Sequence, residues 1–220
     1  RLEKLLSRFI AHPGVRVDTQ MVDQSHELAN LTLVAVVGID EGLFSADFRA
    51  GEKLAQLLIQ VAGRAGRADK RGEVLLQTHH PEHPLLQTLI HGGYSGFAQT
   101  ELVQREAAWF PPFAHIALLR AEARHADAPM QFLQAAKKPL MPWCAPKSAC
   151  DPASSGLTLD GPVPAPMPRR AGMYRAQLLL SSPTRRQLHA ALDDAQSLLF
   201  ALPEARKVRW SLDVDPIDLN

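Results

Sequence analysis

Cysteine is scarce in this chain of 220 residues, and its scarcity excludes several classes of protein. The only two cysteines, Cys144 and Cys150, lie in one irregular stretch without a partner motif, so neither a disulfide framework nor a zinc cluster is expected. Long apolar runs are missing too, since none approaches the roughly 18 residues that a membrane span needs. No signal peptide is visible at the start. These absences predict a cytoplasmic protein.

An excess of charge of either sign is also missing. Lys and Arg number 24 against 23 Asp and Glu, which gives a net charge of +1 and no overall field that would hold nucleic acid. Any contact with DNA would have to come from local patches. Hydrophobic residues make up 46% of the chain, which is ordinary for a globular protein. The length suggests two domains.

A phosphate-binding loop of the form GxxxxGK[ST] is absent, and so is an acidic box of the DExH type that would hold magnesium. We therefore expect that the chain alone does not hydrolyse ATP. It starts without Met, inside the helical pattern of residues 1–10, which predicts a fragment of a longer protein.

The first half of the chain alternates strand and helix patterns, which is typical of an α/β fold with a parallel sheet. Leu31–Ile39 is a continuously apolar, β-branched run, expected as a central strand buried on both faces. The elements predicted after it are, in order, a helix over Ala50–Val61, a strand over Gly72–Thr78, and helices over Pro84–Ile90 and Ser95–Ala108. We place a domain boundary at Trp109–Phe113, which divides residues 1–110 from 111–220.

The second half has the order βαββαβ, which predicts an α+β domain of the split βαβ type. Its predicted elements are strand Ile116–Ala123, helix Ala128–Lys137, a loop to Ser155, strands Leu157–Val163 and Met173–Leu180, helix Pro183–Phe200, and strand Lys207–Val214. Ser182 is the expected cap of the last helix. The expected buried stripe of that helix consists of Leu188, Leu192, Ala195 and Leu199.

The segment Gln60–Arg67 (QVAGRAGR) is the most informative motif. It ends a helix with Arg64 and Arg67 three residues apart, among glycines that let the backbone approach a ligand. Such a pair of guanidinium groups suits phosphate oxygens, and an arginine finger accelerates phosphoryl transfer strongly. The alternative is a solvated basic helix end, continued by Lys70 and Arg71.

Several segments together resemble the PriA-type primosomal protein N′, a superfamily 2 DNA helicase that restarts replication. The similar segments are Gln60–Arg67 (helicase motif VI), Leu43–Arg49 (the "DFR" loop), Gln77–Leu86, Gly161–Ala165 and Leu212–Pro216. The resemblance extends over nearly the whole chain from Thr19 onward. It implies an incomplete RecA-like helicase lobe two, followed by the α+β C-terminal domain.

The resemblance also implies roles for residues of the nucleotide site. Arg67 would be the finger on the γ-phosphate, Arg64 would position that phosphate, and Gln60 would face the nucleotide. Asp40, at the end of the first strand, would face the cleft between lobes. ATP and magnesium would be bound mainly by the missing lobe. The zinc module of the family is absent from these residues.

Two departures from the family pattern lie near Thr19. Thr19 and Gln20 resemble the start of motif V, which couples the nucleotide to DNA, but Gln24-Ser25 stands where the family has a lysine-glycine pair. Residues 14–18 resemble a segment well upstream, yet Thr19 follows them directly. Either intervening residues are left out of this sequence, or the gene carries an internal deletion.

The last third of the chain is locally basic, and its cations suit DNA phosphates or an acidic partner tail as well as a solvated face. These cations are Arg169, Arg170, Arg175, Arg185, Arg186, Arg206, Lys207 and Arg209. By the resemblance, Arg170 and Arg175 would contact forked or single-stranded DNA. Arg185 and His189 would bind the acidic tail of single-strand DNA-binding protein, and other primosome proteins would be partners.

Two clusters have competing interpretations. His79, His80, Glu82 and His83 invite a metal site, but their position between a strand and a helix favours capping and packing, so no metal is expected. Trp109, Phe110 and Phe113 could stack on bases, although aromatics beside two prolines at a domain joint favour a core role.

Two functional hypotheses follow. The first is the C-terminal portion of an ATP-dependent 3′–5′ DNA helicase that restarts replication at stalled forks. The second is a truncated, catalytically silent module that binds forked DNA or single-strand DNA-binding protein.

Overall fold

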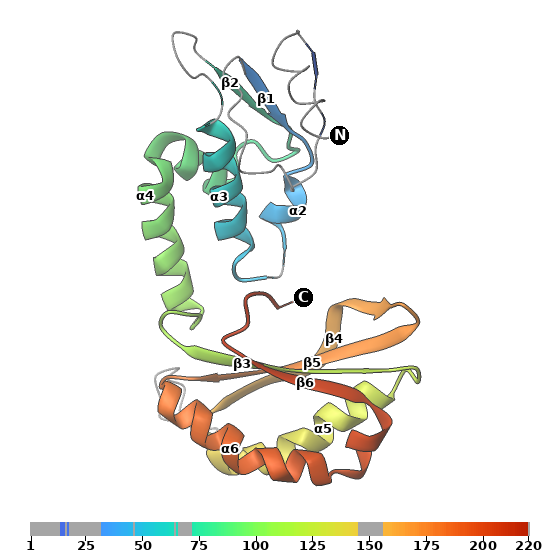
Figure 1. Ribbon diagram of the computed structural model, residues 1–220. Helices are drawn as coiled ribbons and strands as arrows, with labels where there is room; N and C mark the ends of the chain where they lie inside the picture. Colours follow the sequence, from blue (N-terminus) through green and yellow to red (C-terminus); the bar gives the residue numbers. More distant parts are fainter. Residues whose placement is uncertain are drawn as a thin grey trace, which may run out of the picture. The chain divides into compact units, whose positions relative to one another are not determined.

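The structure, a computed structural model, describes residues 14, 15, 17, 32–45, 47–63, 65, 72–144 and 156–219. The chain divides into two compact units (Figure 1). Unit 1 comprises Arg1–Ser45 and Ala50–Ala98, and unit 2 comprises Ala46–Arg49 and Gln99–Asn220. The helix expected over residues 1–10 lies outside the described residues.

Unit 1 contains a two-stranded parallel sheet among its described residues. Strand β1 (Leu33–Val36) pairs with β2 (Glu73–Leu76) in a register that joins Leu33 to Glu73, which confirms the predicted parallel pairing. The short helix α2 (Asp40–Leu43) follows β1, and α3 (Ala50–Ala62) lies between the strands in sequence. The buried core consists of Ile39, Leu54, Ala55, Leu58, Leu86, Leu89 and Phe97.

The prediction that the first strand is buried on both faces was wrong. Exposed and half-buried residues alternate along β1, and Leu33 is 49% exposed. Successive side chains of a strand point to opposite faces, so the alternation shows that one face of β1 is open within the described structure. A uniformly apolar sequence does not show whether one or both faces of a strand are covered.

Helix α4 (Pro84–Ala107) was predicted as two helices, and the structure contains the break between them. Gly93 has non-helical angles (φ 61°, ψ −167°), a conformation that glycine adopts without the steric cost of a Cβ atom. The division between the units falls after Ala98, within α4.

Unit 2 contains a four-stranded antiparallel sheet in the order β4-β5-β3-β6. Its strands are β3 (His115–Ala123), β4 (Thr158–Arg170), β5 (Met173–Ser182) and β6 (Arg209–Val214). Helices α5 (Ala128–Leu140) and α6 (Arg185–Ala201) cover one face (Figure 1), with the 3-10 turns Met141–Trp143 and Pro203–Lys207 after them. The predicted order βαββαβ is confirmed.

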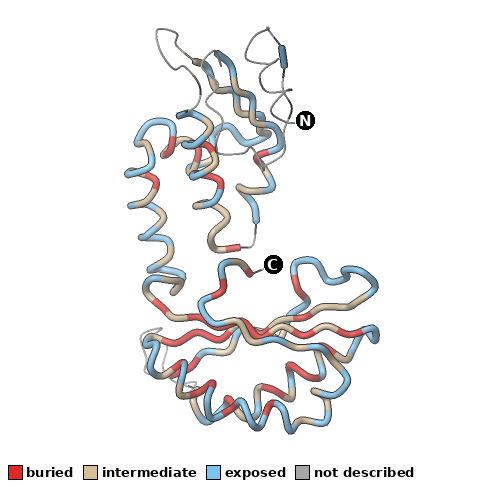
Figure 2. The backbone as a smooth tube through the Cα atoms, in the orientation of Figure 1, coloured by how far each residue is buried: buried red, intermediate tan, exposed pale blue. Residues whose placement is uncertain are grey.

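The main core of unit 2 lies between this sheet and its two helices (Figure 2). Phe132 and Leu133 of α5 and Leu178 of β5 are fully buried there. All four members of the predicted α6 stripe are also buried, as the helical period requires.

Three predicted boundaries in unit 2 change. Thr184, rather than Ser182, caps α6, because its Oγ1 accepts a hydrogen bond of 3.3 Å from the N–H of Gln187. Strand β4 continues to Arg170 because it forms a tight hairpin with β5, in which Ala171 (φ 49°) and Gly172 (φ 79°) make the turn. Helix α5 runs to Leu140, beyond its predicted end at Lys137.

The other face of this sheet has a smaller apolar cluster. Ile116 and Leu118 of β3 are buried there with Leu219, and Phe48 and Phe110 pack against them. The rings of Phe48 and Phe110 are stacked, with centroids 5.0 Å apart. The "DFR" segment thus contributes a side chain to unit 2. No helix in the described part of the chain is long and apolar enough to span a membrane.

Candidate functional site

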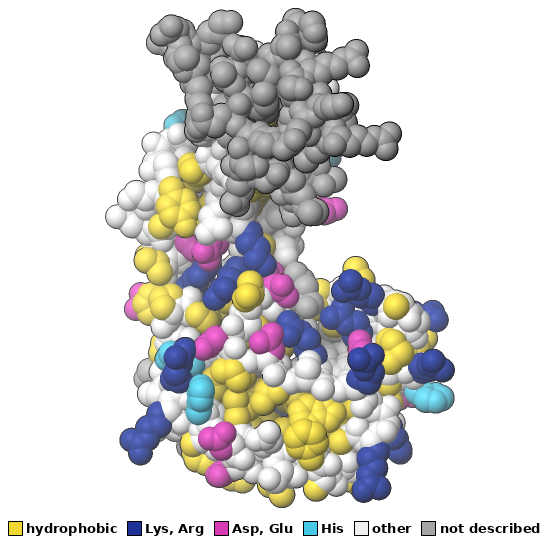
Figure 3. Space-filling model, in the orientation of Figure 1, with side chains coloured by type: hydrophobic (Ala, Val, Ile, Leu, Met, Phe, Trp, Pro, Cys, Tyr) yellow, Lys and Arg dark blue, Asp and Glu magenta, His cyan; other side chains and the backbone are white. Residues whose placement is uncertain are grey.

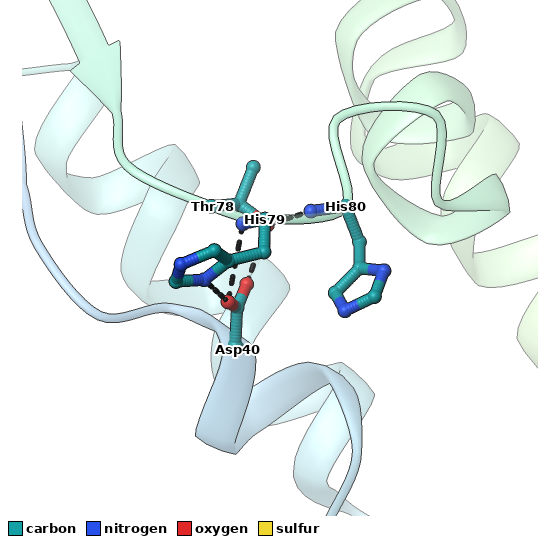
Figure 4. Close-up of polar contacts among 4 residues, drawn as sticks. All are labelled: Asp40, Thr78, His79 and His80. Carbon is teal, nitrogen blue, oxygen red and sulfur yellow. Dashed lines mark hydrogen bonds and ion pairs between the residues drawn. The ribbon is translucent and has the colours of Figure 1, made fainter.

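The carboxyl edge of the β1–β2 sheet holds a cluster of polar side chains (Figure 4). Asp40 begins α2 just after β1, and Thr78 and His79 follow β2. Parallel strands end at the same edge, which is where open α/β sheets bind ligands. The buried Ile39 anchors the chain next to Asp40.

Both oxygens of the Asp40 carboxylate are bound. The Oγ1 of Thr78 donates to Oδ1 over 2.5 Å, and the backbone N–H of His79 donates to Oδ2 over 3.1 Å. The Nδ1 of His79 lies 2.8 Å from Oδ2. The hydrogen bonds from Thr78 and then His79 lower the pKa of Asp40 from 3.8 to about 2, so it is a carboxylate at neutral pH.

This geometry fixes the imidazole of His79. A carboxylate beside Nδ1 favours the tautomer that carries its proton there and leaves Nε2 as an acceptor. The side chain of His79 is 89% exposed, whereas that of Asp40 is 26% exposed. His79 is therefore the member of the pair that presents a free ring edge to solvent. The sequence predicted capping and packing for His79, with a metal ligand as the alternative.

The other histidines of this segment cap and pack. The N–H of His80 donates to Thr78 Oγ1 over 2.9 Å, and the Nδ1 of His83 accepts from the N–H of Leu85 at the start of α4. Both rings meet the ring of Phe44 edge-on, with centroids 4.7 and 5.5 Å away. Within the described ranges, no three His, Cys, Asp or Glu side chains converge as a metal site.

The structure describes one member of the predicted motif VI set. Gln60 lies exposed in the last turn of α3. Arg64 and Arg67, together with Thr19 and Gln20 of the predicted motif V, lie outside the described residues. Of the residues predicted to form a nucleotide site, the structure thus describes only Asp40 and Gln60.

Basic side chains of unit 2 gather near the β4–β5 hairpin (Figure 3). Arg170 lies exposed at the hairpin tip, and Arg169 places its guanidinium 5.2 Å from the ring centre of Tyr174. Half-buried Arg175 lines a shallow pocket of about 290 Å³ with Arg120 and Arg209. Three guanidinium groups at this pocket make an arginine patch, whose positive charge is partly offset by the carboxylate of Glu122 in the same lining.

Arg175 and Arg209 were both among the cations predicted to suit DNA phosphates, whereas Arg120 was missed. Arg120 lies on the open face of β3, and its NH1 donates to Asp213 Oδ2 while its NH2 donates to the carbonyl of Asp218, each over 2.9 Å. The available signal was a cation within an otherwise buried strand. Glu122, two residues later, lies 3.6 Å from Arg209 NH1.

The predicted partner residues lie on α6. Arg185 is 62% exposed, and its NH2 donates to Asp215 Oδ2 over 2.6 Å. His189 is exposed one turn later, so the two side chains share a face of the helix. The guanidinium that was predicted to bind an acidic tail therefore already pairs with the carboxylate of Asp215.

Comparison with known proteins identifies the family. Residues 106–217 match the family model of the primosomal protein N C-terminal domain. This chain belongs to the PriA family. A PriA from Haemophilus influenzae, named replication restart protein, is 48% identical over 206 residues, which cover 94% of this chain and 27% of that protein.

Two more distant PriA proteins match over a similar range. The replication restart protein PriA of Synechocystis is 33% identical over 93% of this chain and 23% of its own length. That of Bacillus subtilis is 33% identical over 97% of this chain and 26% of its own length. The chain therefore spans about a quarter of the PriA relatives that it matches.

Proposed function

We propose that this chain is the C-terminal portion of an ATP-dependent 3′–5′ DNA helicase that recognises stalled replication forks and restarts replication through primosome assembly. The observation that carries this proposal is the similarity of 93–97% of the chain to proteins named for replication restart. The protein would act in the bacterial cytoplasm, at the nucleoid. Its DNA and primosome partners would follow from the same family.

Residues 1–110 would be lobe two of the helicase, and residues 111–220 the C-terminal domain. The parallel pairing of β1 with β2, with α3 between them in sequence, supports a RecA-like arrangement. ATP and magnesium would be held mainly by a lobe outside this chain, because no phosphate-binding loop is present. Zinc would belong to another module of the parent protein.

Motif VI would complete the ATP site. Helix α3 ends at Ala62, and Arg64 and Arg67 follow two and five positions later in the sequence. A guanidinium at the γ-phosphate stabilises the charge that develops during transfer.

The test is Arg67→Ala in the intact parent protein. We expect ATP hydrolysis to fall by about 10³-fold or more, as for loss of an arginine finger. Lys70→Ala is the control, because Lys70 belongs to the basic run but not to the motif. Full ATPase activity in the Arg67→Ala protein would remove the finger assignment.

Asp40 would act on the nucleotide site through His79. Its oxygens already accept from Thr78 and His79, so its role is to orient an imidazole rather than to bind magnesium directly. We expect His79→Ala and Asp40→Asn to lower kcat for ATP hydrolysis in the intact protein by similar factors. His80→Ala is the control, since His80 contacts the ring of Phe44.

Unit 2 would contact the DNA backbone through the pocket of Arg120, Arg175 and Arg209, with Arg170 at the hairpin tip. Each phosphate contact adds about one to the slope of the logarithm of the affinity against the logarithm of the salt concentration. Arg175→Ala should therefore weaken binding to forked DNA of any sequence and reduce the slope against salt by about one. Unchanged binding and slope would exclude this patch.

The second candidate function is a silent module that binds the acidic tail of single-strand DNA-binding protein. The pair between Arg185 and Asp215 favours it, because a tail carboxylate can replace that of Asp215. Asp215→Asn should then strengthen binding of a labelled acidic peptide, and Arg185→Ala should weaken it. Arg206→Ala, also exposed, is the control. Equal affinity in all these variants would exclude Arg185 from the tail site.

A further inference from the structure

A second pocket in unit 2, of about 220 Å³, has no role in the functions above. It lies between the segment after α4 and the sheet, on the same face as Ile116 and Leu179. Its volume is below the roughly 300–1,000 Å³ typical of sites for drug-sized ligands, so it suits a single ring system. The residues that matter are Trp109 on one side and Thr158, Asp160 and Ser181 on the other.

Trp109 is held in a conformation that bulky residues rarely adopt. Its φ is 57°, the left-handed conformation in which helices commonly end. Backbone hydrogen bonds enforce this angle, with Trp109 N–H donating to Glu106 and Phe110 N–H to Arg105. In the described part of the chain, the indole ring has no ring or hydrogen-bond partner, whereas the neighbouring Phe110 stacks on Phe48. Its face is thus available for stacking.

The wall opposite Trp109 contains a buried hydroxyl group. Ser181 is 7% exposed, and it lines the pocket. Its hydroxyl group can donate a hydrogen bond to a polar ligand atom or accept one from it. Thr158 is the register partner of Ser181 across the β4–β5 pair and adds a second, exposed hydroxyl.

Asp160 supplies the charge beside these hydroxyl groups, and a bulge sets its position. The β4–β5 register shifts between Asp160 and Val163. Gly161 (φ 112°) lies in the bulge, where a Cβ atom would come 3.0 Å from the N of Val163. Lys137 Nζ donates to the carbonyl of Gly161 over 3.0 Å. Bulges of this kind aim side chains next to binding sites.

A flat indole face, two hydroxyl groups and a carboxylate match the chemistry of a nucleobase. Stacking on an aromatic ring tolerates any base, but a carboxylate only accepts hydrogen bonds. The exocyclic N4 amino group of cytosine donates, whereas thymine has the O4 acceptor at the same position. The hydroxyl groups can donate to the ring acceptors of cytosine.

We propose that this pocket binds an unpaired base of single-stranded DNA and prefers cytosine to thymine through Asp160. The inference rests on the proposed function, because it assumes that unit 2 contacts DNA. It adds a base-reading site to the phosphate contacts of the arginine patch.

The experiment measures binding of the whole 220-residue chain to labelled oligo-dC and oligo-dT of equal length by fluorescence anisotropy at one salt concentration. Both oligonucleotides have the same phosphates, so backbone contacts cancel in the ratio of affinities. We expect oligo-dC to bind about tenfold tighter, as for one specific base contact. Asp160→Asn should remove the preference, because an amide can donate to O4 of thymine.

Two further variants test the assignment. Asp194→Asn removes an exposed carboxylate from α6 and should keep the preference. Trp109→Leu should weaken binding of both oligonucleotides about tenfold, while Trp109→Phe restores part of the loss.

The outcomes separate the two proposals. Tight but equal binding of oligo-dC and oligo-dT, or a preference that survives Asp160→Asn, overturns the base site and leaves the phosphate contacts intact. No binding of either oligonucleotide overturns the DNA contact of unit 2, and the base site with it.

Discussion

The two units differ in how fully their apolar side chains are covered. In unit 2, Phe132, Leu133 and Leu178 are 0% exposed, and the sheet has apolar clusters on both faces. In unit 1, Leu33 and Leu75 on the two strands are 49% and 55% exposed. Among the residues that the structure describes, the unit with the polar cluster at Asp40 has the smaller core. In unit 1, hydrogen bonds at the ends of two strands position the side chains around Asp40. In unit 2, surface residues can be substituted without changing the buried core.

The largest expected effects come from truncating one buried side chain in the core of each unit separately. Phe132→Ala should lower the free energy of unfolding of unit 2 by about 3–5 kcal/mol, because a fully buried ring leaves a cavity. All three tryptophans, Trp109, Trp143 and Trp210, belong to unit 2, so denaturant titrations followed by their fluorescence report on it.

The matched change in unit 1 is Leu58→Ala, at a residue that is 4% exposed. It should shift the unfolding followed by far-UV circular dichroism and leave the tryptophan transition in place, because the main cores of the two units share no residue. An equal shift of both signals would show that the units unfold as one.

Phe48→Ala tests whether the "DFR" segment stabilises unit 2. Phe48 is half-buried and stacks on Phe110, so we expect a loss of about 1–3 kcal/mol in the tryptophan transition. Phe44→Ala, at a residue 59% exposed, is the control and should cost less than about 1 kcal/mol. A larger loss for Phe44→Ala would contradict the division into units.

Thr184→Ala should destabilise unit 2 by about 1 kcal/mol, because the N–H of Gln187 loses its acceptor at the start of α6. Thr184→Ser keeps the hydroxyl and should restore most of the stability. Thermal unfolding followed by tryptophan fluorescence measures both. If Thr184→Ser is as unstable as Thr184→Ala, the methyl group rather than the cap is responsible.

The smallest expected effect is a pH dependence in unit 1. Folding lowers the pKa of Asp40 from 3.8 to about 2, so its contribution is fully present above about pH 4 and is lost as the pH falls toward about 2. Asp40→Asn should flatten the pH dependence of the circular dichroism melting temperature in that window. The control is Glu41→Gln, at an exposed neighbour. A wild-type slope in Asp40→Asn would assign the dependence to other carboxylates.

Local periodicity was sufficient to predict most of unit 2. The helical period identified Leu188, Leu192, Ala195 and Leu199 as buried, and strand alternation identified Trp210 and Leu212, which pack against the main core. The order of elements then predicted the split βαβ arrangement. These signals are local because each residue faces the core through the geometry of its own element.

Contacts between distant residues were not predictable in the same way. Asp40 and His79 are 39 positions apart, and no period joins them. The capping of α6 by Thr184 instead of Ser182 depends on where Pro183 places the first turn, and both residues are good caps. The bulge after Asp160 and the stacking of Phe48 on Phe110 also depend on tertiary packing.

The residues Ala46–Arg49 belong to unit 2, although the chain on both sides of them belongs to unit 1. The polypeptide therefore passes between the units at three places, and no single cut separates them cleanly. A fragment beginning at Gln99 would lack Phe48 and uncover the ring of Phe110 above the β3 side chains. The C-terminal domain expressed alone should therefore expose an apolar surface that promotes aggregation. A fused copy of the Asp47-Phe48-Arg49 tripeptide or a polar replacement of Phe110 should reduce this aggregation.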